Sequence, residues 1–192
     1  MPRSGEDARR RLQKAALELW GERGYEATTT AQIAERAGVT ERTFFRHFPD
    51  KREVLFDGAA EMRSILIEAL DKAPAKLSPL NALQFAFSAL EPMFEQNRPY
   101  SRLRQKIIAE TPALRERELS KFSLLTTEVA EALEHRGVEA GRAVLTAQIA
   151  RTAFEHAVSS WADSSKETLT KALDRAFKEL RGLFTARDRR RG

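Results

Sequence analysis

The sequence predicts an all-α protein, and three features of its pattern support this fold class. Apolar residues recur at intervals of three and four along most of the chain, the spacing that places side chains on one face of an α-helix. No segment alternates apolar and polar residues for long enough to predict a strand. Capping residues stand where the periodic segments begin, and glycine or proline where several of them end.

The N-terminal segment is predicted to form three helices, the first of which buries Leu12, Ala15, Ala16, Leu19 and Trp20 and ends near Gly24. The second begins after Thr29, whose hydroxyl forms a capping box with Gln32 three residues later. It ends at Gly38, which suits a left-handed turn. The third begins after Thr40 and is short, because Pro49 lacks the N–H that continuation needs.

The remainder of the chain is predicted to form longer helices. We expect them over residues 51–72, 78–97, 98–110, 111–137, 139–162 and 165–185. Ser78 and Thr111, each followed by proline, are typical of helix starts. The pattern therefore predicts an N-terminal domain, residues 1–52, and a larger helical domain, residues 53–192, joined by the helix that begins at Lys51.

Composition excludes several classes of protein. The chain has no cysteine, so disulfides and thiolate metal sites are excluded. No apolar run approaches the roughly 20 residues that a membrane span needs, and the charged start lacks the features of a secretory signal. We therefore expect a cytoplasmic protein without a membrane partner.

The positive charge is concentrated at the two ends of the chain. Residues 1–52 carry 11 Lys and Arg against 8 Asp and Glu, and residues 181–192 carry 5 against 1. The net charge of the whole chain is +5. A region near the N-terminus that binds a polyanion fits this distribution, although an Arg-rich tail also serves solubility.

The two helices on either side of Gly38 form a predicted helix-turn-helix unit. Its inward face consists of apolar residues: Ile33, Ala34, Ala37, Val39, Phe44 and Phe48. The remaining residues of the second helix then project outward: Glu41, Arg42, Thr43, Phe45, Arg46 and His47. A solvated amphipathic helix is the plainer interpretation of the same pattern.

A short exposed helix with basic side chains suits the major groove of DNA, which admits one helix and displays a distinct pattern for each base pair. Arg42 lies near the tip of that helix, where a guanidinium reaches guanine O6 and N7 in bidentate fashion. Thr29, Thr30, Thr40 and Lys51 lie at helix N-termini, which favour phosphate.

The stretch "GYEATTTAQIAERAGVTERTFFRHFPDKREVLF", residues 24–56, resembles the DNA-binding signature of the TetR-type bacterial transcriptional regulators. The resemblance implies an all-helical homodimer that binds a palindromic operator in double-stranded DNA and is released by a small effector. By position it assigns contacts with bases to Glu41, Arg42 and Phe45. It assigns contacts with bases or phosphates to Thr43, Arg46, His47 and Lys51.

Two positions depart from the family pattern. The family usually has tyrosine where Phe45 stands, so a hydroxyl contact with phosphate is replaced by an apolar contact, such as with a thymine methyl. The position of Arg42 is commonly small in the family, which predicts that this protein reads an additional guanine.

The last two helices carry apolar stripes that predict a dimer interface, because two copies would form a four-helix bundle. Packing within one chain is the alternative. The residues expected at the interface are Leu145, Ile149, Val158, Trp161, Leu169, Leu173, Phe177 and Leu180. In TetR-like proteins these two helices form the dimer.

The middle helices offer an apolar lining with a few polar groups, the usual form of a small-molecule site. The residues expected to line it are Leu83, Phe87, Phe94, Arg104, Ile107, Phe122, Leu125, Thr126, Thr152 and His156. Each of them also fits an ordinary core or surface position.

A second stretch, "RLRQKIIAETPALRERELSKFSLLTTEVAEALEHRG", is similar to C-terminal domains of actinobacterial TetR-type regulators grouped as acyl-CoA-like ligand binders. This similarity implies a fatty acyl thioester as the effector. It would place the acyl tail among Phe87, Phe94, Phe122 and Leu125, and the phosphates near Arg102, Arg104 or Arg115. A flat aromatic drug or metabolite is the alternative ligand.

The sequence does not favour an enzyme or a cofactor-dependent protein. The three histidines stand apart, and we find no Ser–His–Asp set, phosphate-binding glycine loop or metal-ligand cluster. A helical binding module or scaffold that does not contact DNA is a further alternative, but it leaves Arg42, Arg46 and Lys51 unexplained. We expect a repressor released by its ligand, while an activator or a corepressed form remains open.

Overall fold

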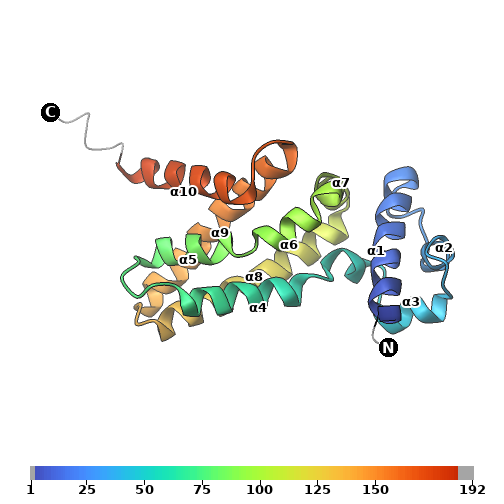
Figure 1. The fold of residues 1–192 in the computed structure, drawn as a ribbon, viewed down its shortest axis with the longest axis horizontal. Helices are drawn as coiled ribbons and strands as arrows, with labels where there is room; N and C mark the ends of the chain where they lie inside the picture. Colours follow the sequence, from blue (N-terminus) through green and yellow to red (C-terminus); the bar gives the residue numbers. More distant parts are fainter. Residues whose placement is uncertain (1–2, 186–192) are drawn as a thin grey trace. The chain divides into compact units, whose positions relative to one another are not determined.

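The computed structural model describes residues 3–185, which are helical with no strand among them (Figure 1). This confirms the predicted all-α class. In chain order the helices are α1 (Arg3–Arg23), α2 (Thr30–Arg36), α3 (Glu41–His47), the 3₁₀ helix η1 (Arg52–Phe56), α4 (Ala59–Lys72), α5 (Pro79–Ser88), α6 (Glu91–Gln96), α7 (Arg98–Glu110), α8 (Pro112–His135), α9 (Ala140–Asp163) and α10 (Leu169–Thr185). None of the helices in this range is both long and apolar enough to cross a membrane.

The described chain folds into two compact units. Unit 1 consists of the residues up to 59 together with residues 100–120, and unit 2 consists of residues 60–99 together with the described residues from 121 onward. Helices α7 and α8 each contribute to both units. The predicted domain boundary after residue 52 remains a prediction.

The core of unit 1 is built by the helix-turn-helix and by residues distant in sequence. Leu12 of α1 and Phe44 of α3 are fully buried, and Phe48 is almost so. Ile107 and Leu114, at the end of α7 and the start of α8, pack into the same cluster. The three-helix segment is therefore completed by a second part of the chain that the sequence analysis had assigned to the other domain.

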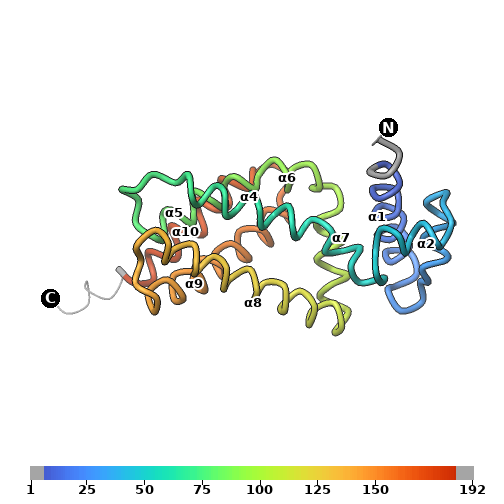
Figure 2. Tube along the Cα trace, turned by 90° about the horizontal axis from the view of Figure 1, so that it is seen from below, coloured from blue at the N-terminus to red at the C-terminus, as the bar shows by residue number. Residues whose placement is uncertain are grey.

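The core of unit 2 forms where α9 packs against α5 and α10 (Figure 2). Buried alanines on α9, such as Ala147 and Ala150, allow neighbouring helices to approach closely. Phe87 of α5 stacks on Phe154 of α9 with ring centroids 4.5 Å apart. Small residues on one helix and rings on its neighbours thus fill this core together.

Two predicted helices are interrupted. The segment expected from residue 51 onward begins instead as η1, where Val54, Leu55 and Phe56 are all buried. Three consecutive side chains lie about 100° apart on an α-helix and do not share one face, so the chain turns before α4 begins. The segment expected over 78–97 divides after Ser88, because Pro92 has no N–H and its ring clashes with the carbonyl of that residue.

Near the start of α7, Glu95 of unit 2 is bound by both an arginine and an indole. Arg98 donates to both carboxylate oxygens of Glu95, at 2.7 and 2.9 Å, and lies over the Trp161 ring at 4.4 Å. The Trp161 indole N–H donates to Glu95 at 2.9 Å. Arg98 also donates to the carbonyls of Ser164 and Glu167, at 2.7 and 2.6 Å. The hydrogen bond from Arg98 is the main cause that lowers the pKa of Glu95 to about 2.

This low pKa predicts an acid-dependent loss of stability. The free energy that ionised Glu95 contributes is fully present above its unfolded pKa of about 4.3 and is lost as the pH falls toward 2. Because the side chain is 35% exposed, we expect a contribution of only about 1 kcal/mol. Urea unfolding of the wild type and of Glu95→Gln should differ at pH 7, and the difference should shrink below pH 4 and disappear only near pH 2.

The matched control is Glu68→Gln, which removes an exposed carboxylate paired with Lys72 on the same helix. Its difference from the wild type should be much smaller at every pH. A difference for Glu95→Gln that stays constant from pH 7 to pH 3 would contradict the assigned pKa.

Candidate nucleic-acid interface

The turn between α2 and α3 has the predicted caps. The Thr29 hydroxyl accepts from the Gln32 amide at 3.2 Å, and the Gln32 side chain accepts from the Thr29 amide at 3.0 Å. Gly38 has a φ of +67°, in the left-handed region that favours glycine. The Thr40 hydroxyl accepts from the Thr43 amide at 3.2 Å and so begins α3.

The rings of α3 separate as predicted into buried and exposed groups. Phe44 is fully buried, with its ring centroid 5.6 Å from that of Phe48. Phe45, the next residue, is 52% exposed and meets the Phe44 ring edge-on. One ring therefore anchors the helix, and its neighbour is presented to solvent.

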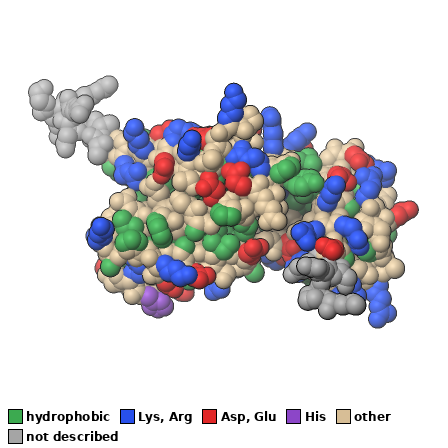
Figure 3. Space-filling model, viewed as in Figure 1, with side chains coloured by type: hydrophobic (Ala, Val, Ile, Leu, Met, Phe, Trp, Pro, Cys, Tyr) green, Lys and Arg blue, Asp and Glu red, His purple; other side chains and the backbone are tan. Residues whose placement is uncertain are grey.

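Arg42 and Arg46 are exposed on α3 and form no ion pair with any described residue. Two basic residues of the neighbouring helices are paired instead: Arg36 donates to both carboxylate oxygens of Glu22, at 2.9 and 3.0 Å, and Arg9 pairs with Asp57. Basic and acidic side chains also alternate on the face of unit 1 that Figure 3 shows. The cations of α3 are thus free to meet an external anion.

Glu41, at the first position of α3, accepts a hydrogen bond from the Thr30 hydroxyl of α2. The two residues expected to face DNA are therefore bound to each other across the turn. This bond orients the carboxylate, which is the acceptor type that reads the amino group of cytosine.

His47 is half-buried rather than projecting freely. Its Nε2 is buried without a hydrogen-bond partner, and burial, followed by the nearby cations Arg46 and Arg9, lowers the pKa of the ring. The imidazole is therefore neutral at neutral pH, which removes the attraction that a charged ring would have for phosphate.

Lys51 also differs from expectation. Its ammonium donates to the carbonyls of Tyr25 and Thr28, at 2.8 and 3.0 Å, and lies 4.0 Å from the centroid of the Tyr25 ring. Burial lowers the pKa of this lysine. Lys51 therefore holds the loop that leads into α2. Its ammonium can make the predicted phosphate contact only through an N–H that is not bound to these carbonyls.

The residues predicted to bind a ligand are divided between the two units. Arg104 and Ile107 lie in unit 1, where Arg104 donates to the Leu55 carbonyl at 3.1 Å and to Glu118 at 3.3 Å. Burial lowers the pKa of this guanidinium. The structure therefore does not group Arg104 and Ile107 with the other predicted ligand residues.

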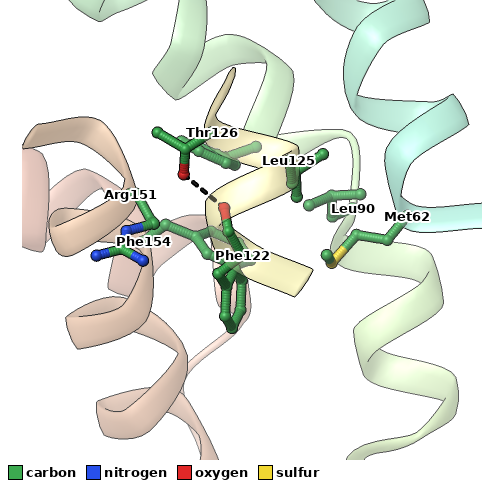
Figure 4. A pocket seen from close by; sticks show the side chains of 8 residues that line it. Met62, Leu90, Phe122, Leu125, Thr126, Arg151 and Phe154 are labelled. Carbon is green, nitrogen blue, oxygen red and sulfur yellow. Dashed lines mark hydrogen bonds between the residues drawn. The ribbon is translucent and has the colours of Figure 1, made fainter. Parts of the chain in front are cut away.

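A small cavity in unit 2 brings together four of the predicted residues (Figure 4). It encloses about 20 Å³, close to the space that one water molecule requires. Its lining consists of Met62, Phe87, Leu90, Phe122, Leu125, Thr126, Arg151 and Phe154. Four of these residues, Met62, Leu90, Arg151 and Phe154, were not predicted from the sequence, although Arg151 is recognisable as a charge one turn before Phe154 on a helix face of small buried residues.

The other predicted ligand residues lie outside this cavity. Leu83 is fully buried in the core, and Phe94 packs edge-on against Phe154. Thr152 and His156 are exposed, with His156 Nε2 3.5 Å from Glu179. Their side chains are therefore not part of the apolar lining.

Unit 1 has a larger but open groove of about 350 Å³. It lies between the end of α1 and the corner from α7 to α8, and its lining includes Arg23, Glu26 and Glu110 as well as Trp20 and Tyr25. Exposed charges of both signs line this groove, so it lacks the apolar enclosure typical of a small-molecule site.

The residues predicted for the dimer interface fall into two groups. Trp161, Leu169, Leu173 and Phe177 are fully buried in their own chain, so they have no surface left for a partner. Leu145 is 60% exposed, and Ile149, Val158 and Leu180 are half-buried. Only the second group remains available for a dimer.

Among residues 3–185, no three His, Asp or Glu side chains lie together as potential metal ligands. The candidate site is the surface of α3 with the N-terminus of α2, where the exposed Arg42 and Arg46 are suited to binding an anion.

Comparison with known proteins matches both parts of the chain. A model of the N-terminal domain of bacterial regulatory proteins of the tetR family matches residues 12–57, and a model of the MftR C-terminal domain matches residues 77–185. The second match alone covers more than half of the 192 residues. The first match includes all the residues predicted to contact DNA.

Two relatives illustrate the similarity. The regulator TcmR of Streptomyces glaucescens is 44% identical over 82 residues, 43% of this chain and 36% of the relative, so the chain spans about a third of its length. MftR of Mycobacterium tuberculosis is described as a mycofactocin biosynthesis transcriptional regulator. It is 24% identical over an alignment that covers 92% of this chain and 94% of the MftR chain.

Solved structures have the same fold. Thermus thermophilus FadR, a TetR family transcriptional repressor in complex with lauroyl-CoA, is 25% identical with a TM-score of 0.51, over 90% of this chain and 92% of its own. The SmeT–triclosan complex has a TM-score of 0.59 at 19% identity, over 90% of each chain, and shows the fold alone. With family matches to both the N-terminal and C-terminal parts, this chain belongs to the TetR family of DNA-binding transcriptional regulators.

Proposed function

We propose that this chain is a cytoplasmic homodimeric repressor that binds a palindromic operator and is released by a hydrophobic small molecule. The observation that carries the proposal is the exposed face of α3, where Arg42 and Arg46 lack any partner among the described residues while Phe45 is presented beside them. Such a face is suited to the edges of bases and to phosphates in the major groove.

The DNA-binding domain in this proposal is residues 1–52. Arg42 and Glu41 read bases, Phe45 makes an apolar contact, and Arg46 contacts phosphate. Thr29, Thr30, Thr40 and Thr43 offer backbone amides and hydroxyls near the helix N-termini. Lys51 acts mainly by supporting the neighbouring backbone, and the half-buried His47 contributes little attraction for phosphate.

Dimerisation is required by the geometry of DNA. Two recognition helices must lie about 34–36 Å apart to enter successive major grooves, and one chain supplies one of them. In our proposal residues 53–192 form the dimerisation and effector domain. The dimer face uses the exposed Leu145 with the half-buried Ile149, Val158 and Leu180.

We propose a fatty acyl-CoA as the effector class, with the acyl tail in the cavity of unit 2. The support is the apolar lining of that cavity and the similarity to the FadR–lauroyl-CoA complex. A twelve-carbon tail needs far more room than about 20 Å³, so binding requires a second, open conformation. A ligand that binds only the open conformation shifts the population toward it, and we propose that this conformation has low affinity for DNA.

Salt-dependent DNA binding tests the proposal directly. Fluorescence anisotropy with DNA from upstream of the chain's own gene should show tight binding whose logarithm falls linearly with the logarithm of salt concentration. For Arg46→Ala we expect the slope to be less steep by about 0.9, because one phosphate contact is lost.

Arg36→Ala is the matched control, since it removes an exposed cation that is already paired with Glu22. Its slope should equal that of the wild type. Absence of binding at low salt would contradict DNA recognition, and binding that lauroyl-CoA leaves unchanged would contradict the effector class alone.

A further inference from the structure

The cavity in unit 2 has few polar side chains, and they differ in their capacity to form hydrogen bonds with a ligand. Six of the residues that line it are apolar, and Thr126 and Arg151 are the two polar ones. In Figure 4, Arg151 and Phe154 approach the cavity from α9, while Phe122 and Thr126 approach it from α8. Any polar atom of a ligand held there must therefore be recognised by Thr126 or Arg151.

The Thr126 hydroxyl is already engaged. It donates to the Phe122 carbonyl one turn earlier on α8, at 2.7 Å, so its oxygen retains only acceptor capacity. A ligand group that accepts hydrogen bonds gains nothing from this hydroxyl.

Arg151 has an unused donor. Its Nε is buried and makes no hydrogen bond with a described residue, and the nearest carboxylate oxygen, of Glu155, lies 3.7 Å away. That distance is too long for a hydrogen bond. The side chain as a whole is 31% exposed and its charge lies within ion-pair distance of Glu155, so only the Nε–H donor is left buried and unsatisfied. Such a donor costs free energy and calls for an explanation.

The other arginines packed in unit 2 are engaged differently. Arg98 donates to Glu95 and to two carbonyls, Arg136 donates to the Leu70 carbonyl at 2.8 Å, and Arg175 donates to Glu167 at 2.8 Å. Their guanidinium groups connect helices, which is a structural role. Arg151 lines the cavity instead and forms no comparable bond through its Nε.

We propose that Arg151 recognises the anionic group of the effector, so that the cavity selects amphiphiles with an acidic head and a long apolar tail. This inference rests on the proposed function, in which unit 2 holds the effector. The anion is either the carboxylate of a fatty acid or a phosphate of an acyl-CoA, both of which accept charge-assisted hydrogen bonds from a guanidinium.

The lining allows the required opening. Met62, Phe122 and Leu125 are half-buried rather than fully enclosed, so their side chains can move without emptying the main core. Glu155 is too distant to hold Arg151 by a hydrogen bond, and the anion of the ligand replaces it as the neighbour of the guanidinium.

Three ligands with the same tail test the inference in calorimetric titrations of the full chain: laurate, lauroyl-CoA and the uncharged ester methyl laurate. Arg151→Gln should bind at least one of the two anions about 10-fold to 100-fold more weakly, the loss expected when one charge-assisted hydrogen bond is removed. Its affinity for methyl laurate should be unchanged. Arg151→Lys should recover part of the loss because it restores the positive charge.

The control is Arg142→Gln, which removes an exposed arginine of the same helix that does not line the cavity. It should bind all three ligands as the wild type does. Leu125→Trp fills the cavity and should weaken all three, which locates their binding. Far-UV circular dichroism establishes that each variant is folded.

The outcomes distinguish the role of Arg151 from the proposed effector site in unit 2. A loss for laurate alone identifies the carboxylate as the source of the anion, and a loss for lauroyl-CoA alone identifies the phosphate. Equal losses for all three ligands, no loss for either anion, or binding only of methyl laurate would overturn the role of Arg151 while leaving a ligand in unit 2. Binding unaffected by Leu125→Trp, or no binding of any ligand, would overturn both the role and the proposed effector site, whereas the DNA titration would still stand.

Discussion

Replacement of Phe44 by alanine is expected to lower the free energy of unfolding by about 3–5 kcal/mol, the usual cost of removing a fully buried ring. Phe44 is 0% exposed and packs against Phe48, whose ring is also buried, at a centroid distance of 5.6 Å. The cavity left by the substitution lies between α3 and the rest of unit 1, so DNA binding should be lost as well. Urea unfolding followed by circular dichroism measures the first effect, and anisotropy with operator DNA measures the second.

The adjacent ring supplies the matched control for this substitution. Phe45 differs from Phe44 by one position but is 52% exposed, so Phe45→Ala should change the free energy of unfolding by less than about 0.5 kcal/mol. It should nevertheless weaken operator binding, because an apolar contact with the bases is removed. Equal losses of stability in the two variants would contradict the orientation of α3.

Replacement of Arg42 by alanine is expected to weaken binding to the operator by about 10-fold to 100-fold, since one good bidentate contact contributes about 1–3 kcal/mol of base discrimination. Arg42 is exposed near the start of α3 and is not paired with any described residue. The preference for guanine should disappear at one position of each half-site. Affinities for a panel of single-base operator variants measure this change.

Arg42→Lys separates base recognition from simple charge. Lysine keeps the positive charge but lacks the planar pair of donors, so the variant should retain the salt dependence of binding while losing part of the preference for guanine. If Arg42→Lys or Arg42→Ala shows the full preference of the wild type, the assignment of a guanine contact is wrong.

The caps and the turn of the helix-turn-helix were predictable because they depend on residues that are close together in the sequence. The hydroxyls of Thr29 and Thr40 accept bonds from amides three residues later, and Gly38 adopts a positive φ. Each of these depends on neighbours within one turn of helix. The division between buried Phe44 and exposed Phe45 follows from the helical period in the same way.

The contacts of long side chains were not predictable, since their partners lie far away in sequence. Lys51 reaches the carbonyl of Tyr25, 26 positions earlier, and Arg104 reaches that of Leu55, 49 positions earlier. A periodicity argument shows which face a residue occupies but not what packs against that face. For this reason Lys51 and Arg104 were expected to meet ligands, whereas the structure engages both inside unit 1.

The apolar stripes of the last two helices show the same limit. The sequence predicted that Trp161, Leu169 and Phe177 lie on apolar faces, and all three do. A stripe of this kind is identical whether it packs within one chain or between two chains, because burial of apolar area has no direction. The structure shows these residues in the core of their own chain.

By itself the sequence determined the all-α class, the caps and turn of the helix-turn-helix, and the outward face of α3, because helical period and capping act over a few residues. The tertiary structure decided which helices form each unit, which cations are already paired, and that Arg151 rather than Arg104 lines the cavity of unit 2. These properties depend on the packing of helices far apart in the chain, which short-range sequence patterns do not predict.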